Sequence, residues 1–135
     1  MSKATRAFLD TGIFIAFLDR SDRWHTEARA LFASAPRSWA TSLLVVAEAH
    51  GWFLHRMGEE PARRFHELLG DMRGLQLLEV TRAHHVATLA MLDRLRGAKL
   101  TYVDAASLVL LAKQRITDVW STDRHLGLTG VPVVP

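Results

Sequence analysis

The fold of this chain is decided by Arg6-Ala7-Phe8-Leu9-Asp10-Thr11-Gly12-Ile13-Phe14-Ile15-Ala16, close to its N-terminus. The first apolar run, 7–9, is too short for a helix, and a second apolar run begins at Ile13 after the polar break. This pattern predicts a buried strand, a turn at Asp10 and a helix that leaves the turn. Ligands of open parallel sheets bind at the carboxyl ends of the strands, so we expect Asp10 at the edge where a site forms.

Strand and helix patterns alternate along the rest of the chain. Predicted strands lie at 6–10, 38–41, 75–80, 118–121 and 131–134, and predicted helices lie at 11–18, 23–35, 43–57, 59–73, 82–96 and 102–115. Ser42, Thr81 and Thr101 precede helices and are predicted N-caps, and Gly58 is a predicted helix end. The alternation predicts an α/β fold, a three-layer α/β/α sandwich with a central parallel sheet, built as one domain over 1–135.

The composition is that of a globular protein that can work without disulfides. The 135 residues are 49% hydrophobic and 23% charged, and the absence of cysteine excludes disulfides and thiolate metal sites. The net charge is +3, mostly from arginine, which is weak support for a nucleic-acid partner because an ordinary solvated surface also carries such a charge. No apolar run is long enough to span a membrane and no signal peptide is recognisable, so we expect a cytoplasmic protein without a membrane partner.

Glu48 is the least ordinary residue of the sequence. Its neighbours at i−4, i−3 and i+4 are Leu44, Val45 and Trp52, which predicts a buried position on an apolar helix face. A buried carboxylate needs a proton, a metal or a cationic partner. The alternative to a metal is an ion pair with an arginine from another element.

Three further acids are placed where they can join Glu48. Asp10 and Asp123 follow predicted strands, and Asp104 opens the apolar helix 102–115. Each has a structural alternative, because Asp10 and Asp123 could cap the helices that follow them and Asp104 forms a Thr101-x-x-Asp104 capping box. Four converging carboxylates repel one another unless a cation lies among them, and oxygen ligands suit Mg²⁺ or Mn²⁺.

The sequence resembles the PIN-domain nucleases, in particular the small stand-alone toxins of the VapC type, over nearly its whole length. The resemblance rests on the order of Phe8-Leu-Asp10-Thr, Glu48, Leu100-Thr-Tyr-Val-Asp104-Ala and Ser121-Thr-Asp123-Arg-His. Ser121 occupies a position where the family often has a small hydroxyl residue, whereas Gly12 replaces its common Ser or Asn. The resemblance implies a parallel sheet flanked by helices, Mg²⁺- or Mn²⁺-dependent endoribonuclease activity, frequent homodimers and often a cognate antitoxin.

We therefore expect a metal-dependent endoribonuclease that leaves 5′-phosphate and 3′-hydroxyl ends. Its metal would be held by Asp10, Glu48, Asp104 and Asp123. Ser121 would orient one of these acids, and Arg124 is the nearest candidate in sequence for binding the RNA backbone. Three alternatives remain: a nuclease of this fold that processes RNA or cuts DNA without an antitoxin, a non-catalytic RNA-binding domain, and a phosphatase-like metal hydrolase.

Histidine and tryptophan residues are given structural roles. His84 and His85 are adjacent, and His50 and His55 are five residues apart, neither of which is a metal-binding spacing on a helix. We therefore assign surface or packing roles to all seven histidines. Core packing is likewise preferred over base stacking for the four tryptophans, Trp24, Trp39, Trp52 and Trp120.

Overall fold

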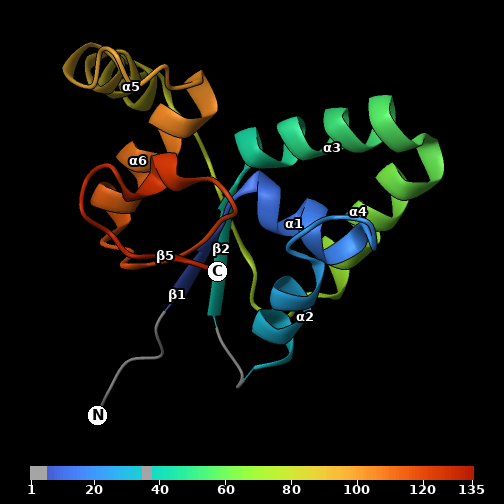
Figure 1. Ribbon diagram of the computed structural model, residues 1–135. Helices are drawn as coiled ribbons and strands as arrows, with labels where there is room; N and C mark the ends of the chain where they lie inside the picture. Colours follow the sequence, from blue (N-terminus) through green and yellow to red (C-terminus); the bar gives the residue numbers. More distant parts are fainter. Residues whose placement is uncertain (1–5, 35–37) are drawn as a thin grey trace.

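A five-stranded parallel sheet forms the centre of the computed structural model, which describes residues 6–34 and 38–135 (Figure 1). The strand order is β3-β2-β1-β4-β5, so the strand nearest the N-terminus lies in the middle. The strands are β1 (Arg6–Leu9), β2 (Ser38–Ser42), β3 (Gln76–Leu78), β4 (Asp118–Trp120) and β5 (Val133–Val134). The predicted α/β fold with a central parallel sheet is confirmed.

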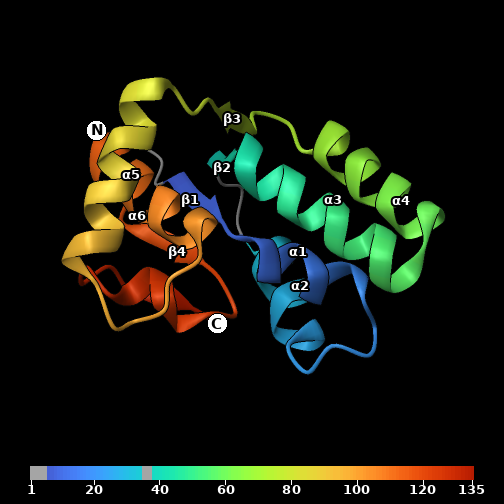
Figure 2. The ribbon, with the colours of Figure 1, turned by 90° about the horizontal axis from the view of Figure 1, so that it is seen from above.

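Helices cover both faces of the sheet. In Figure 2, α5 and α6 lie on one side of the strands, and α1 to α4 lie on the other. The helices are α1 (Thr11–Leu18), α2 (His25–Ala33), α3 (Leu43–Met57), α4 (Glu59–Asp71), α5 (Arg82–Arg94) and α6 (Tyr102–Gln114), and a 3-10 turn, η1 (Arg124–Gly127), follows β4. None of the helices in the described part of the chain is long and apolar enough to cross a membrane.

The three predicted N-caps are confirmed by hydrogen bonds. Each side-chain oxygen accepts a bond from the backbone N–H of the third helical residue, which otherwise has no partner in the helix. The pairs are Ser42 with Val45 (3.1 Å), Thr81 with His84 (3.2 Å) and Thr101 with Asp104 (3.1 Å). These caps fix the starts of α3, α5 and α6, and therefore the positions of Glu48 and Asp104.

The second helix and the third strand are shorter than predicted. Helix α2 begins at His25 rather than at residue 23, because the Asp22 side chain accepts a bond from the Trp24 N–H (2.8 Å) and holds a turn there. The predicted end of this helix at 35 lies outside the described residues. Strand β3 lies at the edge of the sheet and pairs only with β2, and it contains three residues instead of six.

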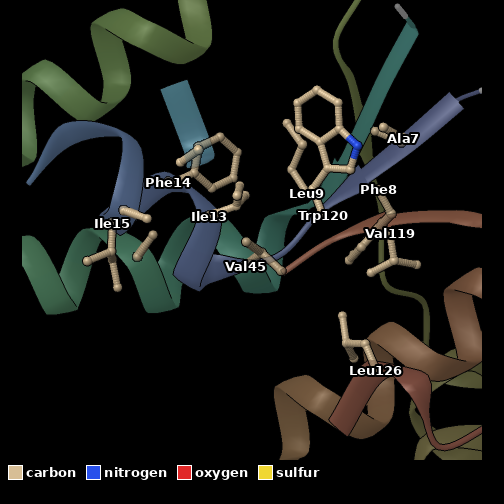
Figure 3. Close-up of a cluster of buried hydrophobic side chains, with 14 of the residues drawn as sticks. Ala7, Phe8, Leu9, Ile13, Phe14, Ile15, Val45, Val119, Trp120 and Leu126 are labelled. Carbon is tan, nitrogen blue, oxygen red and sulfur yellow. The ribbon is translucent and has the colours of Figure 1, made fainter. Parts of the chain in front are cut away.

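The core lies where β1 and β4 meet the first helix. Phe8, Leu9 and Trp120 are buried on these two strands, and Ile13 and Phe14 are buried on α1 (Figure 3). Trp120 is therefore a core residue as predicted, and the other three tryptophans are half-buried against the core. The buried α1 places the residue between β1 and α1, Asp10, at the carboxyl edge of the sheet.

Candidate metal centre

Asp10 and Ser121 meet at the carboxyl ends of two neighbouring strands. Leu9 of β1 pairs with Trp120 of β4, so the next residue of each strand leaves the sheet at the same level. Both side chains are buried, and the Ser121 hydroxyl donates a 2.7 Å hydrogen bond to Asp10 Oδ2. The second carboxylate oxygen, Oδ1, is buried without a hydrogen-bond partner among the described residues. One oxygen of Asp10 is thus fixed, and the other is free to bind a cation.

The surroundings of Asp10 disfavour its negative charge. The pKa of Asp10 is raised from 3.8 to about 6, mainly by burial and to a smaller extent by the nearby charges of Asp104 and Glu48. The Ser121 hydroxyl bond and the adjacent Thr11 backbone N–H lower this pKa but only partly offset the burial. The site therefore gathers negative charge that a cation would stabilise.

Asp104 combines a capping role with a position inside this cluster. It forms the predicted capping box, because its backbone N–H donates to Thr101 Oγ1 (3.1 Å) and its Oδ2 accepts from the Thr101 N–H (3.4 Å). The residue is nevertheless buried, and the same Oδ2 lies 3.1 Å from His125 Nδ1. The capping interpretation is therefore correct but incomplete.

Asp123 is linked to Asp10 by Ser121, whose hydroxyl is hydrogen-bonded to both residues. Its backbone N–H donates to Ser121 Oγ (3.0 Å), and its own Oδ1 accepts from the His125 N–H (2.9 Å), which caps η1. The predicted capping role of Asp123 is thus confirmed. Its carboxylate is half-buried, and one oxygen lies 3.3 Å from His125 Nδ1.

The predicted buried position of Glu48 is wrong. The buried face of α3 is formed by Val45, Ala49 and Phe53, and Glu48 lies on the exposed flank of the helix. Its Oε1 accepts a hydrogen bond from the Thr11 hydroxyl at the start of α1. Within residues 6–34 and 38–135 Glu48 has no ion pair, so the alternative of an arginine partner has no support there. Glu48 faces the site from its solvent side.

His125 is the residue that the sequence analysis missed. Its Nδ1 lies between Asp104 Oδ2 and Asp123 Oδ1, and one ligand atom from each of the three residues falls within 4.8 Å of the others. The surface or packing role assigned to this histidine therefore leaves out its contacts with both acids. The available signal was the Asp123-x-His125 spacing in a tight turn, which a search for paired histidines does not detect.

Comparison with known proteins identifies the family. A family model described as PIN domain matches residues 7–130. The chain belongs to the PIN domain family. No curated protein matches this PIN domain in sequence.

Solved structures share the fold of this PIN domain. VapC20 of Mycobacterium tuberculosis, described as a Sarcin-Ricin loop cleaving toxin, is 23% identical with a TM-score of 0.86, over 93% of this chain and 96% of that chain. A toxin-antitoxin complex from Klebsiella pneumoniae is 21% identical with a TM-score of 0.68, over 96% of both chains. FitAcB from Neisseria gonorrhoeae is 16% identical with a TM-score of 0.69, over 96% of both chains. At these identities the likeness concerns the fold.

The predicted site residues of the PIN domain form two groups joined at Asp10. Asp104 and Asp123 are brought together with His125. Glu48 of α3 is outside that group: it accepts a hydrogen bond from Thr11 at the start of α1, and its charge contributes to the raised pKa of Asp10. The donor set contains carboxylate oxygens and one imidazole, and a buried carboxylate oxygen lacks a partner. Such donors fit a divalent cation.

Gly12 is explained by the residue after Ser121. A Cβ atom added at Gly12 would overlap the Oγ1 of Thr122 and lie 3.4 Å from its Cβ. The Thr122 side chain therefore occupies the space that a residue 12 side chain would need. In this chain the space beside position 12 therefore holds a hydroxyl, but the hydroxyl belongs to Thr122, which follows β4.

Arg124 is only partly available for a ligand. The residue is exposed, and its Nη1 donates a long bond of 3.4 Å to the Val133 carbonyl oxygen of β5. The remaining N–H groups of the guanidinium have no such bond within the described part of the chain.

Proposed function

We propose that this PIN domain is a divalent-metal-dependent endoribonuclease and the toxin of a toxin–antitoxin pair. The proposal is supported most by Asp10 Oδ1, a buried carboxylate oxygen at the carboxyl edge of the sheet that has no hydrogen-bond partner in the described part of the chain. It lies where the charges of Glu48 and Asp104 also act. An enzyme that cleaves phosphodiesters needs positive charge at such a place, because both substrate and site are anionic.

Four residues would hold the metal: Asp10, Glu48, Asp104 and Asp123. Mg²⁺ or Mn²⁺ bound there lowers the pKa of a water molecule and neutralises charge on the scissile phosphate. The carboxylates come from four separate elements, the ends of β1 and β4 and the helices α3 and α6, so the fold rather than local sequence sets their spacing. The expected products carry 5′-phosphate and 3′-hydroxyl ends.

The chain fixes these acids before any substrate arrives. Ser121 orients Asp10, and Thr11 holds Glu48 through its hydroxyl. Asp104 and Asp123 are held by the capping bonds of α6 and η1. Ligands that are already oriented lose little conformational freedom when a cation binds. The unbonded N–H groups of Arg124 would contact an RNA phosphate.

The proposed toxin role is based on solved structures that share this fold. VapC20 is described as a toxin that cleaves the Sarcin-Ricin loop, and the Klebsiella pneumoniae structure is a toxin-antitoxin complex. We infer an RNA substrate, a cognate antitoxin and a homodimer for this chain. Inspection of the neighbouring gene tests the antitoxin: we expect it to encode a small protein that forms a stable complex with this chain on co-expression and suppresses RNA cleavage.

RNA cleavage is tested by incubating the full chain with total RNA in EDTA and in Mg²⁺ or Mn²⁺, followed by mapping of the cut ends. We expect cleavage only with the metal, and loss of cleavage in Asp104→Asn. Asp71→Asn is the matched control, because Asp71 is exposed at the end of α4. Undiminished cleavage in EDTA, or equal activity of Asp104→Asn and Asp71→Asn, would contradict the proposal.

A further inference from the structure

We infer that His125 binds the metal ion directly through Nδ1, and that this nitrogen ligand makes the site select Mn²⁺ over Mg²⁺. The inference rests on the proposed function, because it assigns a ligand and a metal preference to the same centre. It adds a residue outside the carboxylate set, contributed by the turn η1.

The spacing around His125 is that of ligands on one ion. Its Nδ1 lies 3.1 Å from Asp104 Oδ2 and 3.3 Å from Asp123 Oδ1. In an octahedral site with bonds of about 2.1 Å, neighbouring ligand atoms are about 3 Å apart and opposite ones about 4.2 Å. The two nitrogen–oxygen distances match those of neighbouring ligands, and the ligand atoms of all three residues fall within 4.8 Å of one another.

A hydrogen bond from Nδ1 accounts for only one of the two carboxylate contacts of His125. A ring nitrogen carries either one hydrogen or one lone pair, so Nδ1 cannot make a good bond to both carboxylates at once. Asp123 Oδ1 already accepts the backbone N–H of the same histidine at 2.9 Å. A cation beside Nδ1 uses its lone pair and both carboxylate oxygens together.

The turn holds His125 in place. Asp123 caps η1, and the next residue, Leu126, is completely buried in the core (Figure 3). The imidazole itself is about one-third exposed, with its side chain 37% accessible, so an ion can reach it from solvent. The residue therefore combines a fixed backbone with an accessible nitrogen.

A nitrogen ligand changes which ion is preferred. Mg²⁺ binds oxygen ligands almost exclusively, whereas imidazole suits first-row transition metals, which follow a rising order of affinity from Mn²⁺. Asp10, Asp104 and Asp123 accept both kinds of ion. His125 is the member of the site that distinguishes Mn²⁺ from Mg²⁺.

The test is pulsed electron paramagnetic resonance on the full chain loaded with one equivalent of Mn²⁺. We expect a nitrogen coupling from a directly bound imidazole, and its loss in His125→Asn. His50→Gln is the matched control: His50 Nδ1 lies 2.9 Å from His66 Nε2, a pair of ring nitrogens outside the proposed site that could also bind a metal ion. The coupling should persist in His50→Gln.

Competition between the two ions gives a second measurement. Loss of a residue that merely supports a ligand commonly lowers metal affinity about 10- to 100-fold, so loss of a ligand should cost at least as much. We expect the Mg²⁺/Mn²⁺ ratio of dissociation constants to fall at least about ten-fold in His125→Asn, mainly through weaker Mn²⁺ binding. His50→Gln should leave this ratio unchanged.

The outcomes separate the two proposals. Tight Mn²⁺ binding without nitrogen coupling in the wild-type protein would overturn the role of His125 and leave the proposed nuclease intact, whether or not the variant folds. Coupling that disappears in His50→Gln would assign the nitrogen to the His50–His66 pair and also overturn it. Absence of Mn²⁺ binding, together with RNA cleavage in EDTA, would overturn both proposals.

Discussion

Ser121 donates a 2.7 Å hydrogen bond to Asp10 across the ends of two paired parallel strands. The bond satisfies one oxygen of a buried carboxylate and leaves the other without a partner. The same hydroxyl oxygen accepts the Asp123 N–H at 3.0 Å. A single small side chain therefore sets the relative positions of two acids that are 113 residues apart in the sequence.

Ser121→Ala is expected to raise the pKa of Asp10 above its value of about 6, because the hydroxyl bond favours the charged carboxylate. It leaves Asp10 Oδ2 buried without its donor, which should lower the free energy of unfolding by about 1–3 kcal/mol. The pKa is measured by NMR titration of the carboxyl carbon in EDTA, and stability by urea unfolding.

Ser107→Ala is the matched control for this substitution. Ser107 is equally buried, but its hydroxyl has no hydrogen-bond partner within residues 6–34 and 38–135. Its removal should leave both the Asp10 pKa and the stability nearly unchanged. Equal effects of the two alanine variants would show that the Ser121–Asp10 bond has no special role.

The metal-free protein should lose stability between about pH 4 and 6 because of Asp10. The folded pKa of about 6 lies above the ordinary 3.8, so the folded state holds this proton more tightly than the unfolded state. The stabilisation is complete below pH 3.8 and is lost as the pH rises through 6. A pKa shift of this size changes the free energy of unfolding by about 3 kcal/mol at most.

Asp10→Asn removes this titration. In EDTA, its free energy of unfolding relative to wild type should increase from pH 4 to pH 7, as measured by urea unfolding at several pH values. Mn²⁺ should stabilise the wild type at pH 7 and have little effect on the variant. Parallel pH profiles of the two proteins would contradict the raised pKa.

The fold was predictable because its signals are local. Caps such as Ser42 and Thr101 and the break at Asp10 mark where elements begin and end, and short apolar runs mark buried strands. Alternating strands and helices then leave few topologies. The length of β3 was overestimated because this strand lies at the edge of the sheet and pairs with one neighbour only. Its own sequence does not show that it is an edge strand.

The candidate site was only partly predictable because it depends on packing between elements. The neighbours of Glu48 at i−4, i−3 and i+4 show that apolar residues are near, but not which face of α3 meets the core. His125 meets Asp104 across 21 residues through a turn whose direction the tertiary fold sets. The acids could be identified by their places after strands and at helix starts, whereas these two contacts could not.

Glu48→Gln should leave the stability of the metal-free protein within about 0.5 kcal/mol of wild type, since Glu48 is exposed and the amide oxygen can still accept the Thr11 hydroxyl. It should reduce both RNA cleavage and the rise in melting temperature caused by Mn²⁺. Glu67→Gln, at an exposed position of α4, is the control for loss of one negative charge. Equal Mn²⁺ stabilisation in both variants would remove Glu48 from the metal site.

Gly12 and Thr122 should be energetically coupled. Gly12→Ala places a Cβ against Thr122 Oγ1, and overpacking of this kind costs about 1–3 kcal/mol. Gly51→Ala is the control, because it lies in the interior of α3 with nothing near its Cβ and should stabilise the protein by up to about 1 kcal/mol through helix propensity.

Thr122→Ala removes the overlapping oxygen, and the remaining Cβ lies at a tolerable 3.4 Å from the new methyl group. In the double variant Gly12→Ala/Thr122→Ala, the cost of the alanine at 12 should therefore vanish, giving a coupling free energy of about 1–3 kcal/mol in a double-mutant cycle. Urea unfolding in EDTA measures the four proteins without any contribution from metal binding. Additive effects would mean that Thr122 moves aside without cost and does not determine the glycine at position 12.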